Sequence, residues 1–241
     1  MRFSLLLLLP AVGCLTAAVW SYSARPSAPS AAEQARERAA TPEGYVYVPG
    51  GECLLGSNDP DADGGQRPEH RKFLPSFYIA RHEVTQAEWK RFRPDHVVPA
   101  GKEGYPITNV GRDEAMAYCR WVAGYLPSDD EWEKAARGVD GRRYPWGNEF
   151  EPTRTNLGRP RKLPPEVCAV PGIRRGLVPV EAFPTGASPY GALQMAGNAW
   201  EWVSGNYDGD PQRWIIRGGA YGYGELAART YHRAIEGAGV T

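Results

Sequence analysis

The sequence predicts a single loop-rich domain of the α+β class, and three observations support this prediction. The chain has 241 residues, of which 42% are hydrophobic, so one core of ordinary size can form. Glycine and proline together number 28 + 22 = 50, which is high for a globular domain and favours irregular chain. Helix signals are few but well formed, and runs of strand-forming residues are short.

Residues 1–42 are expected to precede this domain, which would span residues 43–241. Residues 1–24 contain an early arginine, an apolar run and then small residues, as in an export signal. Three outcomes stay open: signal cleavage near Thr16, lipid attachment at Cys14 in a lipoprotein-like AVGC, or an uncleaved anchor. Residues 25–42 lack apolar periodicity, which predicts a flexible linker. We therefore expect an exported protein in a bacterial periplasm or anchored to the envelope.

Three helices are predicted from their capping residues and apolar spacing. Thr85 and Glu88 form a capping box that predicts a helix from about residue 86 to residue 93. The stretch RDEAMAYCRWVAG (112–124) carries one apolar stripe, consisting of Ala115, Tyr118, Cys119 and Val122, so Cys119 should be buried. Ser128 and Glu131 cap a third helix, which Gly138 ends. Capping and the helix dipole account for the acidic residues at its start, namely Asp129, Asp130, Glu131 and Glu133.

Charge and cysteine content exclude several classes of partner. Basic and acidic residues are equal at 28 each, so no overall field attracts nucleic acid, and membrane contact is expected only through the N-terminal segment. If Cys14 belongs to a signal, the remaining cysteines can form at most one disulfide; they are Cys53, Cys119 and Cys168. No cysteine or histidine spacing suits zinc.

One acidic stretch resembles the opening of an EF-hand calcium loop. Asp59, Asp61 and Asp63 have the right spacing, but the twelfth position is His70 instead of a bidentate glutamate. No flanking helices are apparent, so we interpret this stretch as a solvated turn.

Seven motifs occur in one order between about residues 44 and 233: PGGECLLGS, HEVTQAEW, AMAYCRWV, YLPSDDEWEKAARG, YPWGN, GALQMAGNAWEW and IIRGGAY. Together they resemble the successive signatures of the formylglycine-generating enzyme, or sulfatase-modifying factor, family. The resemblance implies a modified C-type-lectin-like fold with few short helices, short antiparallel strands and much irregular chain.

The resemblance also implies a structural calcium ion at MAGNAWEW. Its ligands would be the side chains of Gln194 and Glu201 and the carbonyl groups of Gly197 and Ala199. Gln194 stands where the family has Asp or Asn, which should weaken the site. The alternative is that the two flanking tryptophans are only core and that Glu201 faces solvent from a strand. A second family site, beginning at Asn156 and Leu157, is expected to be lost or reshaped because Arg174 and Arg175 bring positive charge.

The copper chemistry of the family requires two thiols near its Arg-Gly-Gly segment, because soft sulfur selects monovalent copper. Residues 217–241 contain no cysteine, and Tyr223 and residues 226–228 stand near those positions. Copper-dependent oxidation is therefore expected to be absent. An iron triad is not indicated either, because the histidines lack its spacing; they are His70, His82, His96 and His232. The Gly-Phe-Arg strand that commonly closes the family is also missing.

These observations lead to a first hypothesis of a calcium-supported binding or accessory module that acts on a protein, peptide or envelope ligand. The inherited groove would be lined by Arg217, Tyr221, Tyr223 and Tyr231, although the tyrosines could equally be core residues. The second hypothesis is an enzyme, either a formylglycine former with a relocated thiol pair or another oxygen-dependent oxidase. A scaffold without a substrate is the third.

Overall fold

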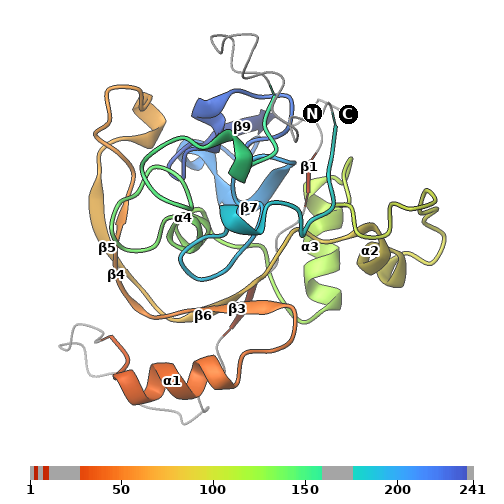
Figure 1. The fold of residues 1–241 in the computed structure, drawn as a ribbon, viewed down its shortest axis with the longest axis horizontal. Helices are drawn as coiled ribbons and strands as arrows, with labels where there is room; N and C mark the ends of the chain where they lie inside the picture. The colour runs from red at the N-terminus through yellow and green to blue at the C-terminus, as the bar shows by residue number, and fades with distance from the viewer. Residues whose placement is uncertain (1–2, 5–7, 11–27, 159–175, 238–241) are drawn as a thin grey trace.

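The computed structural model describes residues 3–4, 8–10, 28–158 and 176–237, and it confirms a mixed α+β fold with short elements (Figure 1). The helices in these residues are α1 (Ala31–Ala39), α2 (Gln86–Phe92), α3 (Arg112–Trp121) and α4 (Asp129–Arg137). Short antiparallel strands and long irregular connections make up much of the remainder, as the glycine and proline content predicts.

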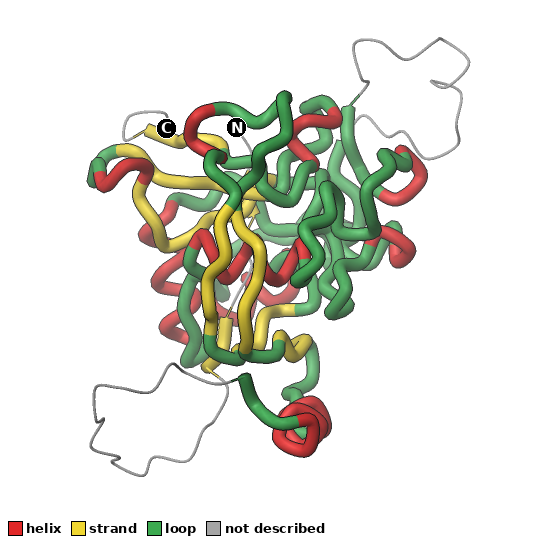
Figure 2. Tube along the Cα trace, turned by 90° about the vertical axis from the view of Figure 1, so that its left-hand side faces the viewer, coloured by secondary structure: helices red, strands yellow, loops and turns green. Residues whose placement is uncertain are grey.

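Three small sheets organise the strands. The largest has the order β1 (Phe3–Ser4), β7 (Trp200–Asn206), β8 (Arg213–Arg217) and β9 (Ala234–Gly237). The second contains β2 (Leu8–Pro10), β6 (Phe77–Ala80) and β3 (Tyr45–Val48), and the third pairs β4 (Gly51–Leu55) with β5 (His70–Leu74). Figure 2 shows the β4–β5 ribbon along the side of the molecule that faces the viewer. All pairs are antiparallel except β1 with β7.

The N-terminal segment is only partly described. Residues 3–4 and 8–10 form β1 and β2, whereas Cys14 and the candidate cleavage site lie outside the described residues. No helix in the described part of the chain has the length and apolar character needed to cross a membrane. At the other end, β9 pairs with β8, so this edge of β8 is covered.

The capping boxes at Thr85 and Ser128 are confirmed, and α2 and α4 begin directly after them. The predicted linker, in contrast, contains helix α1 over residues 31–39, which was not predicted from the sequence. Ser30 and Glu33 form the same capping box, and the absence of an apolar stripe concealed it. In both views α1 lies at the foot of the molecule beside β3 and β6 (Figures 1 and 2), and none of its residues is buried.

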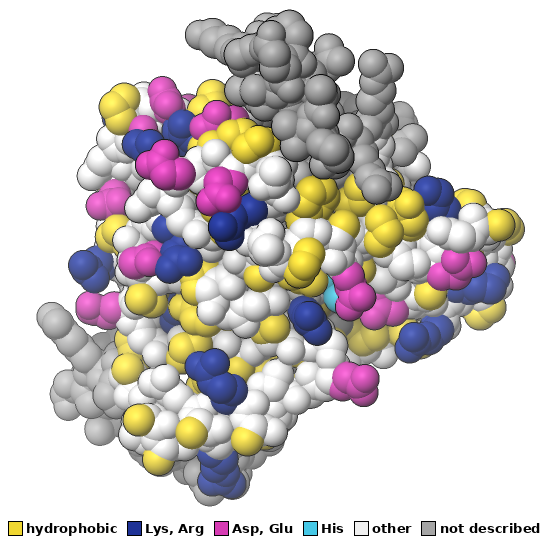
Figure 3. All heavy atoms as spheres, viewed as in Figure 1, with side chains coloured by type: hydrophobic (Ala, Val, Ile, Leu, Met, Phe, Trp, Pro, Cys, Tyr) yellow, Lys and Arg dark blue, Asp and Glu magenta, His cyan; other side chains and the backbone are white. Residues whose placement is uncertain are grey.

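One large hydrophobic cluster forms the core. It joins α2, α3 and α4 to the sheet that contains β6 and to the sheet that contains β7. Within it, Trp132, Trp200 and Trp202 are each at most 2% exposed. Cys119 is buried in this cluster, as predicted, whereas Cys53 belongs to a small separate cluster between β4 and β5. Acidic and basic side chains are interspersed on the face shown in Figure 3.

Two capping serines allow a matched test of which helix belongs to the cooperative unit. Ser128→Ala should lower the free energy of unfolding by about 1 kcal/mol, because α4 carries buried residues of the core. Ser30→Ala removes an equivalent cap from α1, which buries nothing, and should leave global unfolding in urea unchanged. An equal loss in both variants would contradict this division.

Candidate functional site

The chain around Gly197 folds into a coiled turn that explains its Gly-Asn pair. Gln194, Gly197 and Asn198 all have left-handed φ angles, of 58°, 90° and 62°. A side chain at Gly197 would place its Cβ 2.5 Å from the carbonyl oxygen of Asn156, so only glycine fits there. Asparagine tolerates the left-handed region better than most residues. The turn is held by backbone bonds from Gly197 to Gly218 and from Asn198 to Asn156.

Glu201 follows this turn and is fully buried. Trp200, Glu201 and Trp202 are successive residues of β7 and are each at most 2% exposed, so both faces of this strand are covered. The alternative in which Glu201 faces solvent is therefore wrong. The indole Nε1 of Trp132 donates a hydrogen bond of 2.5 Å to Oε2 of Glu201, while Oε1 has no hydrogen-bond partner. Burial raises the pKa of Glu201 to about 8, and the Trp132 bond opposes this shift.

A second buried carboxylate, Glu83, lies beside the first and was missed in the sequence. Its Oε2 accepts a hydrogen bond of 2.7 Å from the side-chain amide of Asn198, and its Oε1 has no partner. Burial raises the pKa of Glu83 well above its usual value, and the charge of Glu201 raises it further. The oxygen of the Asn198 amide accepts from Asn156 and from the backbone of Val178. No local pattern marks Glu83, because its partner is 115 residues away.

The four predicted calcium ligands are only partly brought together. A Cβ built on Gly218 would lie 3.9 Å from both the Ala199 carbonyl oxygen and the Glu201 carboxyl carbon, so both groups lie near Gly218. Gly197 lies in the turn that precedes them. Gln194, however, directs its amide nitrogen to the carbonyl of Ala182 at 2.6 Å. An unpartnered buried carboxylate oxygen beside main-chain oxygen suits a hard cation, whereas Gln194 is already engaged elsewhere.

The four predicted groove residues differ in burial: two are buried and two are partly exposed. Arg217 is 1% exposed and donates to Asp129 at 2.5 Å and to Glu133 at 3.0 Å. Tyr231 is 2% exposed, and its hydroxyl donates to Asp59 at 3.0 Å. Tyr221 and Tyr223 remain partly exposed.

The interpretation of Glu133 as one of the acids at a helix start is incomplete. It is 3% exposed and bridges Arg217, Arg137 and the backbone amide of Gly56, the last at 2.8 Å. Together with Arg217, Tyr231 and Asp129 it lines a polar cavity of about 190 Å³. The charge of Glu133 is thus used for tertiary contacts, which helix-capping rules do not reveal.

The remaining candidate metal groups have protein partners. Asp59 pairs with Arg143 at 2.7 Å, and Asp61 pairs with Arg229 at 3.0 Å, so arginines neutralise this acidic stretch. Within the described residues, no group of three or more potential metal-binding side chains converges. Each histidine is within hydrogen-bond distance of a protein atom; these are His70, His82, His96 and His232. Arg174, Arg175 and Cys168 lie outside the described residues.

Comparison with known proteins agrees with the motifs. Residues 30–240 match the family described as the sulfatase-modifying factor enzyme 1-like domain. Inactive C-alpha-formylglycine-generating enzyme 2 of Mus musculus is 30% identical over 230 residues, covering 73% of this chain and 73% of that protein. The formylglycine-generating enzyme of Thermomonospora curvata is 29% identical, covering 70% and 73%. Hercynine oxygenase of Mycolicibacterium smegmatis is 34% identical, covering 66% of this chain but 45% of that protein.

Two solved structures share the fold. PvdO from Pseudomonas aeruginosa superposes with a TM-score of 0.63 at 20% identity, covering 80% of this chain and 88% of that one. CarF superposes with a TM-score of 0.57 at 20% identity, covering 83% and 94%. At this identity the likeness concerns the fold alone.

The raised pKa of Glu201 predicts a pH dependence of stability. The folded state keeps a proton that the unfolded chain releases above its ordinary pKa of 4.5. Stability in a chelating buffer should therefore fall as pH rises from about 4.5 to about 8, by up to about 1.4 kcal/mol per pH unit.

Glu201→Gln should remove this part of the slope, because an amide can still accept the Trp132 bond but does not titrate. Urea unfolding at several pH values measures both proteins. A slope that stays unchanged in the variant would show that Glu201 does not titrate in this range.

Proposed function

Because the chain belongs to the sulfatase-modifying factor family, we propose that it is an exported, calcium-supported member that binds a ligand and does not oxidise cysteine. This proposal rests on the residue types found in the segment after β8. No thiol stands between Arg217 and Arg233. The ring of Tyr223 instead packs edge-to-face on Trp200 with 5.1 Å between centroids, and Ala227 and Ala228 are buried nearby in the chain.

The two described cysteines are poor substitutes for a copper-binding pair. Cys53 and Cys119 are both free and buried, and they lie in different hydrophobic clusters. Burial raises the pKa of Cys53 to about 11 and that of Cys119 to about 12, so both remain protonated thiols at neutral pH. Monovalent copper requires thiolates that converge. The name of the murine relative, an inactive formylglycine-generating enzyme, is consistent with such a loss.

Calcium would serve this protein as a structural ion. The unpartnered Oε1 of Glu201 and the carbonyl of Ala199 support the proposal, and the carbonyl of Gly197 is the third ligand we assign. Gln194 would have to exchange its bond to Ala182 for the ion, which is a reason to expect modest affinity. Bound calcium would compensate the charge of Glu201, which burial otherwise disfavours.

The ligand surface that we propose is the partly exposed side of the segment after β8. Tyr221 and Tyr223 are partly exposed there, and Leu226 is 52% exposed. Aromatic and aliphatic groups of this kind suit a protein or peptide partner. The N-terminal residues 1–24 support export to a bacterial periplasm or envelope, where such a partner would be met.

An enzymatic role is the second candidate, because relatives of similar identity are named formylglycine-generating enzyme and hercynine oxygenase. A relocated thiol pair or a different metal would be required. The chemistry therefore has to be tested directly on the purified protein.

The mature chain should neither take up copper(I) stoichiometrically nor convert cysteine to formylglycine in a sulfatase-type peptide. The reason is the absence of thiols near Tyr223. Copper uptake is measured by competition with a copper(I) chelator, and the peptide product is measured by mass spectrometry. Oxidation of the peptide that requires bound copper would overturn the proposal in favour of the enzyme.

Calcium should stabilise the protein through Glu201. If the dissociation constant is ~0.1 mM, 1 mM calcium adds about 1.4 kcal/mol to the free energy of unfolding. Glu201→Gln should lose this gain, whereas Glu52→Gln, which changes an exposed acid on β4, should keep it. Urea unfolding of both variants, with calcium and with a chelator, measures this gain in the free energy of unfolding. A gain of equal size in both variants would place the ion elsewhere.

A further inference from the structure

A cleft distant in sequence from the family's metal and thiol motifs lies between helices and strands of the core. We call it the Tyr118 cleft; its lining includes Glu43, Tyr45, Glu88, Arg91, Tyr118 and Trp121. It opens between the start of β3, the end of β6 and the helices α2 and α3. Its volume of about 260 Å³ suits a small head group or one side chain. None of its lining residues belongs to the segment 194–233.

Aromatic rings form the walls of the cleft. Tyr118 is 4% exposed and stacks on Trp89 with ring centroids 5.4 Å apart, so its position is fixed. The ring centroids of Trp121 and Tyr118 are 5.8 Å apart, and Trp121 is 51% exposed at the rim. Tyr45 completes the aromatic lining from β3. An indole left half exposed beside fixed rings provides a ready surface for a bound group.

A carboxylate is held rigidly among these rings. Oε2 of Glu88 accepts hydrogen bonds of 2.8 Å from both the backbone and the hydroxyl of Thr85, since Glu88 closes the capping box of α2. Burial is the main reason that the pKa of Tyr45 is raised to about 12, and the charge of Glu88 is the second reason. The same two causes raise the pKa of Tyr118. Glu88 lines the cleft together with both tyrosines.

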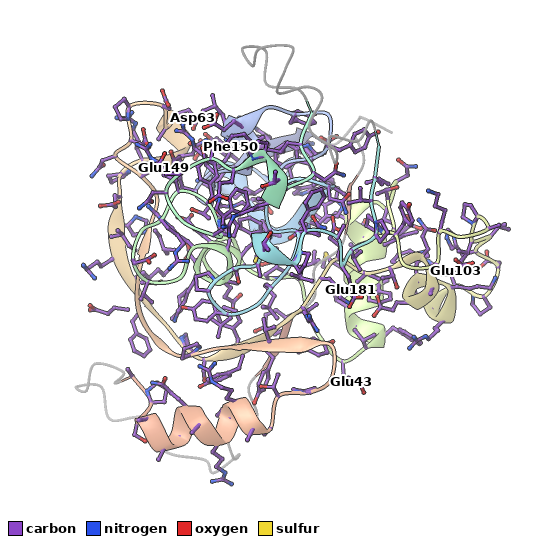
Figure 4. All side chains as sticks on the ribbon, in the orientation of Figure 1. Glu43, Asp63, Glu103, Glu149, Phe150 and Glu181 are labelled. Carbon is purple, nitrogen blue, oxygen red and sulfur yellow. The ribbon has the colours of Figure 1, made fainter. Side chains whose placement is uncertain are left out.

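The charges around the cleft favour a cation. Glu43 and Glu88 contribute two carboxylates, and Arg91 contributes one guanidinium. Figure 4 shows Glu43 beside the lower end of α3, and the contacts of the cleft place it at the rim. Arg91 is exposed on α2 and also lines a hollow on the neighbouring side of this helix, and its charge lowers the pKa of Tyr118 that burial and Glu88 raise.

We propose that the Tyr118 cleft binds an organic cation, an alkylated ammonium group, between its aromatic rings and the Glu88 carboxylate. Rings attract a cation through their negative faces, and the partly buried Glu88 carboxylate, held by Thr85, adds a fixed opposite charge. A neutral ligand of the same shape gains neither contribution. The site is separate from the segment after β8, so it stands whether or not the chain oxidises cysteine.

The test compares choline with its uncharged carbon analogue, 3,3-dimethyl-1-butanol, on the full mature chain. Choline should bind at millimolar concentration and at least about tenfold more tightly than the alcohol. Titration calorimetry gives both affinities. The indole N–H signal of Trp121, assigned by its loss in Trp121→Ala, should shift on addition of choline.

Three variants locate the site. Glu88→Gln keeps the helix cap, because glutamine also closes a capping box, and it should weaken choline binding about tenfold by removing the charge. Trp121→Ala changes an exposed side chain, leaves folding intact and should weaken binding to a similar extent. Glu103→Gln, an exposed acid that Figure 4 shows on the far side of α2 from Glu43, should have no effect.

Equal binding of choline and the alcohol would overturn the proposal, as would choline binding that survives both Glu88→Gln and Trp121→Ala. No detectable binding of choline would also overturn it. A neutral sugar that shifts the Trp121 signal more than choline does would assign the cleft to a different ligand class and refute the cationic one.

Discussion

The buried guanidinium of Arg217 fixes the arrangement on which the rest of the structure depends. It is bound by Asp129 and Glu133 of α4 and by the carbonyl groups of Thr230 and His232, so one side chain joins α4, β8 and the chain after β8. A buried charge is tolerated only when its hydrogen bonds are satisfied, and these partners can satisfy it in one geometry. Trp132 is the residue before Glu133, and it reaches Glu201 from the same helix. The position of α4 thus determines both the ion pair and the surroundings of the Glu201 carboxylate.

This arrangement is built from nitrogen and oxygen groups and from backbone, without a thiol. The turn around Gly197 is held by backbone bonds to Gly218 and Asn156, and the strand that follows is covered on both faces. Tyr223 packs on Trp200 and helps to close the core there. The contacts that hold this segment in place therefore do not depend on a thiol pair.

Sequence reasoning succeeded where the cause was local and failed where it was not. The starts of α2 and α4 follow from capping residues three positions apart, and the burial of Cys119 follows from helical spacing. Helix α1 has an equally good capping box but no apolar stripe, so weighting periodicity above capping hid it. Glu83 and Glu133 could not be assigned because their partners, Asn198 and Arg217, are 115 and 84 residues away. The same limit applied to Arg217, whose motif suggested a groove but whose partners Asp129 and Glu133 lie on helix α4.

The Tyr118 cleft illustrates how a local element can serve both folding and recognition. Glu88 closes the cap of α2, which fixes its carboxylate without any ligand, and the stacking of Tyr118 on Trp89 fixes the adjacent ring. A site whose charged group and wall are already ordered loses little conformational entropy on binding. The hydrogen bonds that stabilise the start of α2 therefore already hold a negative charge beside aromatic rings. The Tyr118 cleft and the segment after β8 depend on different parts of the core, because no residue that lines the cleft belongs to the segment 194–233.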